Sequence, residues 1–159
     1  MTMPGLHSLT SGSASDLRPR VLVADDDPVT RTLIHCRLES LGALVFEAED
    51  GSQALRTLGA ESIDLLIADV EMPNMNGLEL IGRVRAHPHL HVQRLPVVVL
   101  TGSEGQSAKD AAFATGATSF HLKPLKWTAF GHHIRTILET VMQARIPDLV
   151  ATAESPTQR

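Results

Sequence analysis

The sequence contains a single cysteine, Cys36, so it cannot form an internal disulfide framework and it suits a reducing compartment. No apolar run approaches the length of a membrane span, and the N-terminal residues lack the charged-then-apolar order of a signal peptide. The formal net charge of −4 offers no basic surface for nucleic acid, and no nucleotide-binding glycine motif occurs. These absences predict a cytoplasmic protein that contacts neither membrane nor nucleic acid directly.

What the sequence does contain is a regular alternation of short apolar runs and helix-length amphipathic stretches. The apolar runs cover 20–24, 43–49, 64–69, 95–102 and 118–124, and the helical stretches cover 28–42, 51–60, 77–87, 105–116 and 125–143. Helices between strands imply parallel strands with right-handed crossovers, and a sheet covered on both faces has nearly continuous apolar strands. We therefore predict an α/β fold, a flavodoxin-like (βα)5 three-layer sandwich with a parallel sheet in the order 2-1-3-4-5.

The two ends of the chain differ from this alternating region. Residues 1–18 are rich in Ser, Thr and Gly, and residues 146–159 contain prolines and end in polar side chains. Such composition is typical of segments without a core of their own. We expect one domain at 19–145 with a flexible tail at each end.

Polar residues gather where the predicted strands end. The first strand is followed by Asp25 and Asp26, the third ends on Asp69, the fourth on Thr101 and the fifth on Lys123. In open parallel sheets the functional site lies at the carboxyl ends of the strands, and neighbouring strands are only about 4.8 Å apart. We therefore expect these side chains to share one pocket.

The charges in this pocket indicate what it binds. Two carboxylates about 4 Å apart repel by roughly 4 kcal/mol at an effective dielectric near 20, so one lysine cannot balance three of them. Either some carboxylates are protonated or a divalent cation binds, and ligands that are all oxygens favour Mg²⁺ or Mn²⁺ over zinc. Lys123 and Thr101 suit the oxygens of a phosphoryl group, which a carboxylate can accept covalently. The residues thus indicate a site that makes and holds an aspartyl phosphate.

Four separated motifs carry a resemblance to a known family. They are "VLVADDDP" (21–28), "DLLIADVEMPNMNG" (64–77), "VVVLTG" (97–102) and "FHLKP" (120–124). In this order they resemble the receiver domain of two-component response regulators, of the chemotaxis-regulator-like kind, over residues 20 to 143. The resemblance implies a signalling domain rather than an enzyme, in which Asp69 takes a phosphoryl group from a sensor histidine kinase or histidine phosphotransfer protein. It also implies Mg²⁺ (or Mn²⁺) held by Asp25, Asp26, Asp69 and the backbone carbonyl of Glu71.

The same resemblance implies roles for further residues. Thr101 and Lys123 would bind the phosphoryl group, and Phe120 would be the switch aromatic where many members carry Tyr. Glu71 and Ser103 would tune the lifetime of the phosphate, and the Lys123–Pro124 peptide would be cis. The altered surface would be formed by residues 105–116, 118–124 and 125–143, and it would bind a downstream protein or a second copy of the chain.

Three alternatives stay open at this point. In a haloacid-dehalogenase-type phosphatase, Asp25 and Asp27 would form the nucleophile motif, but Asp69 would then have no role and no later strand ends in an acidic pair. The chain could also be a binding module that works without phosphorylation. Because too few residues follow 145 for an output domain, it is either a single-domain regulator or a receiver fragment of a larger protein, such as the cyclic-di-GMP enzymes that "KPLKW" (123–127) resembles.

Several histidines and Cys36 have simpler interpretations. The "HPHLH" run at 87–91 is predicted to be a solvated loop rather than a metal site. His132 and His133 are adjacent, so they point in different directions on a helix and cannot pair with each other. Cys36 is expected to be a core or half-buried residue of its helix.

Overall fold

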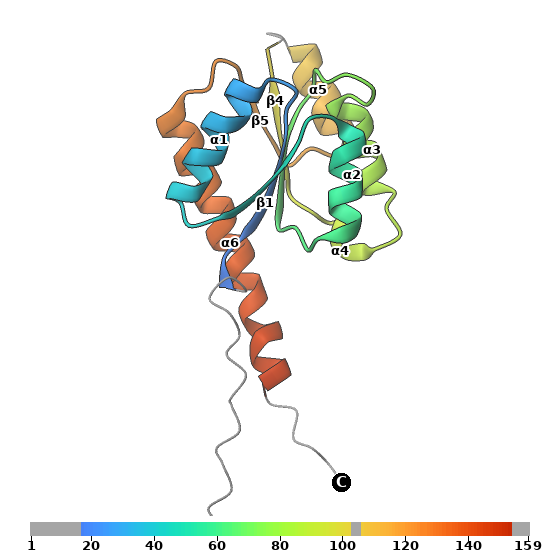
Figure 1. The fold of residues 1–159 in the computed structure, drawn as a ribbon. Helices are drawn as coiled ribbons and strands as arrows, with labels where there is room; N and C mark the ends of the chain where they lie inside the picture. The colour runs from blue at the N-terminus through green and yellow to red at the C-terminus, as the bar shows by residue number, and fades with distance from the viewer. Residues whose placement is uncertain (1–16, 103–105, 154–159) are drawn as a thin grey trace, which may run out of the picture.

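The centre of the molecule is a five-stranded parallel sheet in the order β2-β1-β3-β4-β5 (Figure 1). This computed structural model describes residues 17–102 and 106–153. The strands are β1 (Arg20–Ala24), β2 (Leu44–Ala48), β3 (Leu65–Asp69), β4 (Val97–Thr101) and β5 (Ser119–Leu122). All four neighbouring pairs are parallel. The predicted flavodoxin-like fold and its strand order are confirmed.

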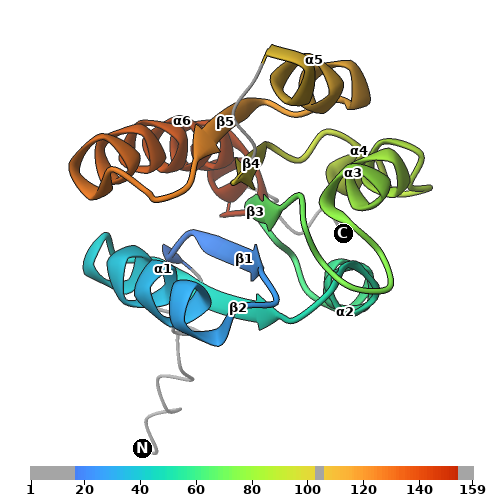
Figure 2. The same cartoon turned by 90° about the horizontal axis from the view of Figure 1, so that it is seen from above.

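Helices cover both faces of this sheet, which makes three layers (Figure 2). On one face lie α1 (Pro28–Ser40) and α6 (Trp127–Ala153), and on the other lie α2 (Gly51–Ala60), α3 (Gly77–Arg85) and α5 (Gln106–Thr115). Successive strand residues point to opposite faces, so Val23 packs with Ile34 and Phe130 in one core while Leu22 packs with Leu80 in the other. A strand that serves two cores must be apolar throughout, which explains the continuous runs in the sequence.

Three helices begin with a side chain that accepts hydrogen bonds from the first turn. Asp27 accepts from the backbone N–H groups of Val29 and Thr30 at the start of α1. Asp50 and Asn76 make the equivalent bonds at the starts of α2 and α3. Such caps satisfy backbone donors that have no partner within the helix. They fix where each helix leaves the carboxyl edge of the sheet.

The connection between α3 and β4 contains a short helix, α4 (Leu90–Gln93), so the prediction of a loop at 87–91 was wrong for its last residues. Val92 of this helix is buried in the core. The guanidinium of Arg85 donates hydrogen bonds of 2.8 Å to the backbone carbonyls of both Gln93 and Leu95. The helix depends on this anchor from α3, which the local sequence does not show.

The last helix is longer than expected. Its predicted end at residue 143 was wrong, because α6 continues to Ala153 and extends past the amino ends of the strands (Figure 1). Pro147 removes one helical hydrogen bond, but the leucine and alanines around it are good helix formers. The rest of the predicted C-terminal tail, like residues 1–16, lies outside the described residues. Long as α6 is, none of the helices in the described ranges combines the length and apolarity needed to cross a membrane.

Candidate functional site

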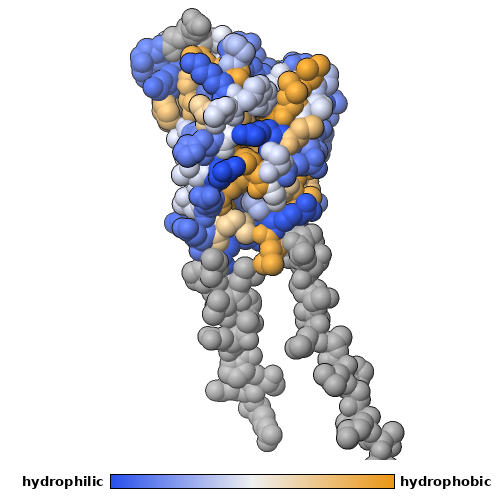
Figure 3. All heavy atoms as spheres, turned by 90° about the vertical axis from the view of Figure 1, so that its left-hand side faces the viewer, coloured by the Kyte–Doolittle hydropathy of each residue, from blue (hydrophilic) through white to orange (hydrophobic). Residues whose placement is uncertain are grey.

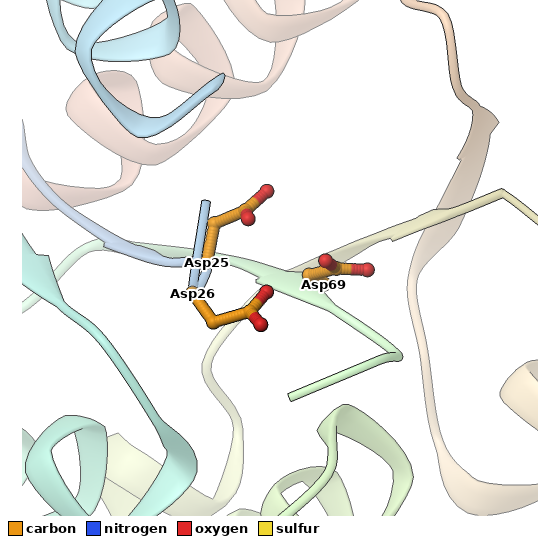
Figure 4. A group of neighbouring side chains, drawn as sticks. All are labelled: Asp25, Asp26 and Asp69. Carbon is orange, nitrogen blue, oxygen red and sulfur yellow. The ribbon is translucent and has the colours of Figure 1, made fainter. Parts of the chain in front are cut away.

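Three carboxylates converge at the carboxyl edge of the sheet (Figure 4). Ala24 of β1 pairs with Ala68 of β3, so the next residues on the two strands, Asp25 and Asp69, lie side by side. Each of Asp25, Asp26 and Asp69 offers an oxygen atom, and these atoms all lie within 4.8 Å of one another. Asp25 and Asp69 are buried, with 0% and 4% of their surface exposed, whereas Asp26 is exposed. The structure thus brings together the three acids that the sequence places at two strand ends.

Lys123 bridges the two buried carboxylates. Its Nζ lies 2.7 Å from Oδ2 of Asp25 and 2.9 Å from Oδ2 of Asp69. The backbone N–H of Lys123 donates to the carbonyl of Thr101 at 2.8 Å, and the Lys123–Pro124 peptide is cis, as predicted. The ammonium group is therefore held by β5 at the point where β1 and β3 end.

Burial and the hydrogen bonds of the shared lysine shift the pKa values of Asp69 and Lys123. Burial raises the pKa of Asp69, and the hydrogen bond from Lys123 opposes this only in part. Burial alone would lower the pKa of Lys123, but its hydrogen bonds with Asp25 and Asp69 outweigh that effect and the pKa is raised. Lys123 is thus a firmly charged cation that two carboxylates must share.

Backbone N–H groups hold the remaining oxygen atoms of these carboxylates. The N–H of Asp27 donates to Oδ1 of Asp25 at 2.9 Å, and the N–H of Glu71 donates to Oδ1 of Asp69 at 3.2 Å. The side chain of Asp27 caps α1 and is not one of the three acids that gather here. A nucleophile pair of Asp25 and Asp27, as the phosphatase alternative requires, does not form here.

The loop after Asp69 folds back against it, and Gly77 makes this possible. A Cβ atom on Gly77 would overlap the carbonyl oxygen and carbon of Asp69. The N–H of Gly77 donates to the carbonyl of Val70 at 2.9 Å, and Asn76 caps α3 at the same point. The amide oxygen of Asn76 serves as the cap by accepting from the N–H of Glu79. The backbone of the site therefore depends on having no side chain at position 77.

The donor set fits a hard divalent cation such as Mg²⁺. The three acids supply only oxygen ligands, and Lys123 leaves their negative charge in excess. Mg²⁺ binds oxygen at about 2.0–2.1 Å and usually keeps several waters, so a few protein oxygens at such separations are enough. Among the side chains that the structure describes, no other set of three His, Cys, Asp or Glu gathers as closely, the histidines at 87–91 included.

The other predicted site residues lie around this centre or outside the described part. Thr101 ends β4 and is buried, with 1% of its surface exposed. Phe120 on β5 is partly buried and packs against the core on the α2, α3 and α5 side. Ser103 lies outside the described residues.

One residue of the site could not be found from the sequence. Arg31 on α1 donates from Nη1 to the backbone carbonyl of Asp25 at 2.7 Å and forms an ion pair of 3.4 Å with Glu47 on β2. It fixes the turn that carries Asp25. No local pattern indicates this role, since both contacts require the folded sheet.

An apolar surface adjoins the acids on the α1 and α6 side. Val29, Leu33 and Trp127 are exposed by 65%, 50% and 37%. Figure 3 shows that face, with apolar side chains in orange among the charged ones. Cys36 lies there too and is exposed, so the expectation that it is a core or half-buried residue was wrong. The chain therefore presents large apolar side chains next to its charged site.

The profile of the response regulator receiver domain matches residues 21–151. The chain belongs to this family. The receiver is 42% identical to an uncharacterized 14.6 kDa protein in the sodA1 3′ region of Leptolyngbya boryana, over 66% of this chain and 79% of that protein. It is 34% identical to the CAI-1 autoinducer sensor kinase/phosphatase CqsS of Vibrio cholerae, over 66% of this chain. The receiver spans only 15% of CqsS, so its likeness concerns one part of that protein.

Solved receiver structures agree with the fold described above. The chemotaxis response regulator CheY4 of Vibrio cholerae matches with a TM-score of 0.70 and 29% identity, over 76% of this chain and 99% of that one. The receiver domain of the sensor histidine kinase PA1611 from Pseudomonas aeruginosa matches with a TM-score of 0.69 and 25% identity, over 77% and 98% of the two chains. That structure contains a magnesium ion coordinated in its active site cleft.

Proposed function

We propose that this receiver accepts a phosphoryl group on Asp69 from a histidine kinase or phosphotransfer protein in the cytoplasm, and that the phosphate alters a protein-binding face. The observation that carries the proposal is the buried Asp69 carboxylate at the end of β3, 2.9 Å from Lys123 and within a group of three acids. A carboxylate in this setting can act as a nucleophile while nearby cations stabilise the incoming negative charge.

The transfer is a displacement at phosphorus, in which one bond forms as another breaks. A carboxylate oxygen of Asp69 forms the new P–O bond while the P–N bond of the donor phosphohistidine breaks, and the electron pair returns to the imidazole. Lys123, already between Asp25 and Asp69, is placed to donate to a phosphoryl oxygen as charge builds on it. When bound by Asp25, Asp26, Asp69 and the Glu71 carbonyl, Mg²⁺ would supply further neutralisation of that charge.

The new phosphate would act on the strands beside it. It brings about −1.5 to −2 charge, which attracts the hydroxyl of Thr101 at the end of β4. Val99 of β4 pairs with Phe120 of β5, so a change in β4 reaches the aromatic ring. Phe120 lines a groove of about 520 Å³ on the face of α5, β5 and α6, together with Lys109, Leu122 and Lys126. Phosphorylation would shift the population of this face toward the form that a downstream protein, or a second copy, binds.

Hydrolysis would end the signal, and residues beside Asp69 would set its rate. Glu71 lies two positions after Asp69 and donates its N–H to that carboxylate, so its side chain leaves the backbone close to the phosphate. Ser103 follows Thr101 closely in the sequence. We propose that these two side chains tune the access of the hydrolytic water and hence the lifetime of the phosphate.

The phosphodonor would dock on the exposed apolar surface of Val29, Leu33 and Trp127. This surface adjoins the start of α1, where Asp26 and Asp27 lie. Exposed large apolar side chains that gather in one place usually mark a contact with another protein. A donor helix bound there would have its phosphohistidine next to the acids.

Incubation with acetyl phosphate and Mg²⁺, followed by intact mass spectrometry, tests the proposal. We expect one phosphoryl group on the wild type, none after Mg²⁺ is chelated, and none on Asp69→Asn. Asp64→Asn is the matched control, because Asp64 is another buried aspartate, just before the same strand. Equal labelling of Asp69→Asn and wild type would contradict the proposal, and no labelling of the wild type would favour a module that works without phosphorylation.

A further inference from the structure

Two histidines outside the site face each other, one on a strand and the other on a helix. Nε2 of His121 on β5 lies 2.7 Å from Nδ1 of His133 on α6. The two ring centroids are 5.0 Å apart. This equals the nitrogen–nitrogen distance plus the distance from each ring centre to its own nitrogen, so the two nitrogens point almost directly at each other. A single proton must lie between them, since one nitrogen donates and the other accepts.

We propose that the His121–His133 pair is a proton-dependent contact that holds α6 against β5 and opens when both rings are protonated. Its effect on the output face rests on the proposed function, because Phe120 lies on the same strand and Lys123 directly follows that strand. The contact itself does not depend on phosphorylation.

The protons can be followed explicitly. In the neutral pair one ring donates its N–H to the bare nitrogen of the other. A first extra proton binds the outer nitrogen of the donor ring, and the shared bond remains as a charge-assisted one. A second proton binds the accepting nitrogen, so two N–H groups and two positive charges then face each other. The bond is lost at this second step only.

The surroundings favour the closed pair at neutral pH. On the α5 side Lys109, and after β5 Lys126, line the same groove as His121, and none of the described residues lining it is a carboxylate. Burial, followed by the charge of His133, lowers the pKa of His121. Double protonation therefore requires acid conditions.

The geometry favours a proton over a metal ion. Zinc bound by two imidazoles at about 2.0–2.1 Å needs the nitrogens to approach it at an angle, not head-on. Within the described ranges no third His, Cys, Asp or Glu side chain joins this pair. A bridging metal would therefore have to rearrange both rings and recruit water.

The position of the pair connects it to the signalling face. Within the described sheet β5 is an edge strand that pairs with β4 alone, and the His121–His133 contact joins it to α6. His121 packs edge-on against Phe130 at 5.3 Å, and Phe130 packs edge-on against Trp127 at 6.0 Å. Trp127 is the only tryptophan in the sequence, so its fluorescence reports on the opening of this contact.

The first experiment titrates the full chain, metal-free and unphosphorylated, from neutral to acid pH. Trp127 fluorescence and histidine ring NMR are measured on the wild type, His133→Gln, His121→Gln and the control His132→Gln, which changes the exposed neighbour of His133. We expect an acid fluorescence step in the wild type and in His132→Gln, and its loss in both pair variants. The pH at which His121 titrates should differ between His133→Gln and the wild type, because the shared bond is lost in the variant. Titration of His121 at the same pH in both, or a step that persists in both pair variants, would overturn the proposal. So would stoichiometric Zn²⁺ that moves both rings at neutral pH.

The second experiment tests the link to the output face. The NMR response of Phe120 to acetyl phosphate and Mg²⁺ is compared in the wild type and His133→Gln at neutral pH. We expect the Phe120 signals of the two proteins to change by different amounts, because the histidine contact is closed only in the wild type. Equal changes in the two proteins would overturn the link. If neither protein is phosphorylated, the proposed function fails while the titration result stands by itself.

Discussion

Two buried aspartates flank the same strand and behave differently. Asp64 precedes β3 and Asp69 ends it, and they are exposed by only 5% and 4%. Asp64 accepts from Arg145 at 3.0 Å and from the backbone N–H of Arg20 at 2.7 Å. Asp69 shares Lys123 with Asp25. A buried carboxylate alone therefore does not mark a functional site, but an excess of carboxylates over cations does.

The contrast extends to stability. Asp64 has two hydrogen-bond donors, the Arg145 guanidinium and the Arg20 N–H, and both lose their partner when the carboxylate is removed. The raised pKa of Asp69 means that the fold favours its protonated form. Stability from this residue is then present at low pH and is lost as the pH rises through the folded pKa. One end of β3 is arranged for stability, and the other keeps a carboxylate at some cost for chemistry.

Removing the two carboxylates should have opposite effects on stability. We expect Asp64→Ala to lower the free energy of unfolding by about 2–4 kcal/mol, because it leaves Arg145 and the Arg20 N–H without this partner. Asp69→Asn, in metal-free buffer near neutral pH, should be at least as stable as the wild type. Urea unfolding followed by circular dichroism measures both. A large loss in Asp69→Asn would show that the comparison is wrong.

Replacing the cationic partner of each aspartate by glutamine should likewise separate effects on the phosphorylation rate from effects on stability. Lys123→Gln should slow phosphorylation by acetyl phosphate about 100-fold, because one oxyanion-stabilising donor is lost. Arg145→Gln should leave that rate unchanged and lower the free energy of unfolding by about 1–2 kcal/mol. Rates come from intact mass spectrometry over time. Slow phosphorylation of Arg145→Gln together with a wild-type rate in Lys123→Gln would reverse the roles assigned to the two ends of β3.

Alanine substitutions at two glycines test whether the backbone at Asp69 tolerates displacement. Gly77→Ala should cost about 1–3 kcal/mol and reduce phosphorylation, since the new Cβ meets the Asp69 carbonyl. Gly59→Ala is the control: its Cβ meets nothing within 4 Å, and it lies in α2. That variant should gain about 0.5–1 kcal/mol from helix propensity. Phosphorylation by Gly77→Ala at the wild-type rate would show that the loop tolerates displacement.

The smallest expected effect concerns His35, a partly exposed histidine of α1 that pairs with Glu39 and Glu47. Burial opposes protonation of His35, but its hydrogen bonds to Glu47 and Glu39 outweigh this and raise its pKa above the ordinary 6.5. A histidine with a raised folded pKa stabilises the fold below 6.5, and this contribution is lost as the pH rises through the folded value. Thermal unfolding of His35→Gln should therefore approach the wild type as the pH rises. A gap that widens instead would contradict this sign.

The sequence predicted the carboxyl end of the sheet far better than the amino end. Asp25 and Asp69 each follow an apolar strand, and parallel register alone places them side by side. Asp64 and Arg145 are 81 residues apart in sequence, and nothing local marks them as partners. His121 and His133 likewise meet only because α6 packs against β5. Periodicity predicts elements and their ends, but not which surface side chains those elements bring into contact.

The two errors in the elements have different causes. The short helix α4 is held by hydrogen bonds from Arg85 of α3, so its own sequence contains little signal. The extension of α6 passes a proline, which normally predicts an end. Asp27, in contrast, caps α1 through hydrogen bonds with the next turn, which are contacts between neighbours in the sequence. The cap depends on residues next to it in the sequence, whereas the Arg85 contacts that hold α4 depend on the folded chain and have no local signal.

The central claim is that Asp69 alone receives the phosphoryl group, although the sequence from 25 to 27 offers three more aspartates. Treatment with acetyl phosphate and Mg²⁺, then borohydride, reduces an aspartyl phosphate to homoserine, and peptide mass spectrometry finds its position. We predict homoserine at position 69 and at no other aspartate. Homoserine at position 25 or 27, with none at 69, would contradict the account.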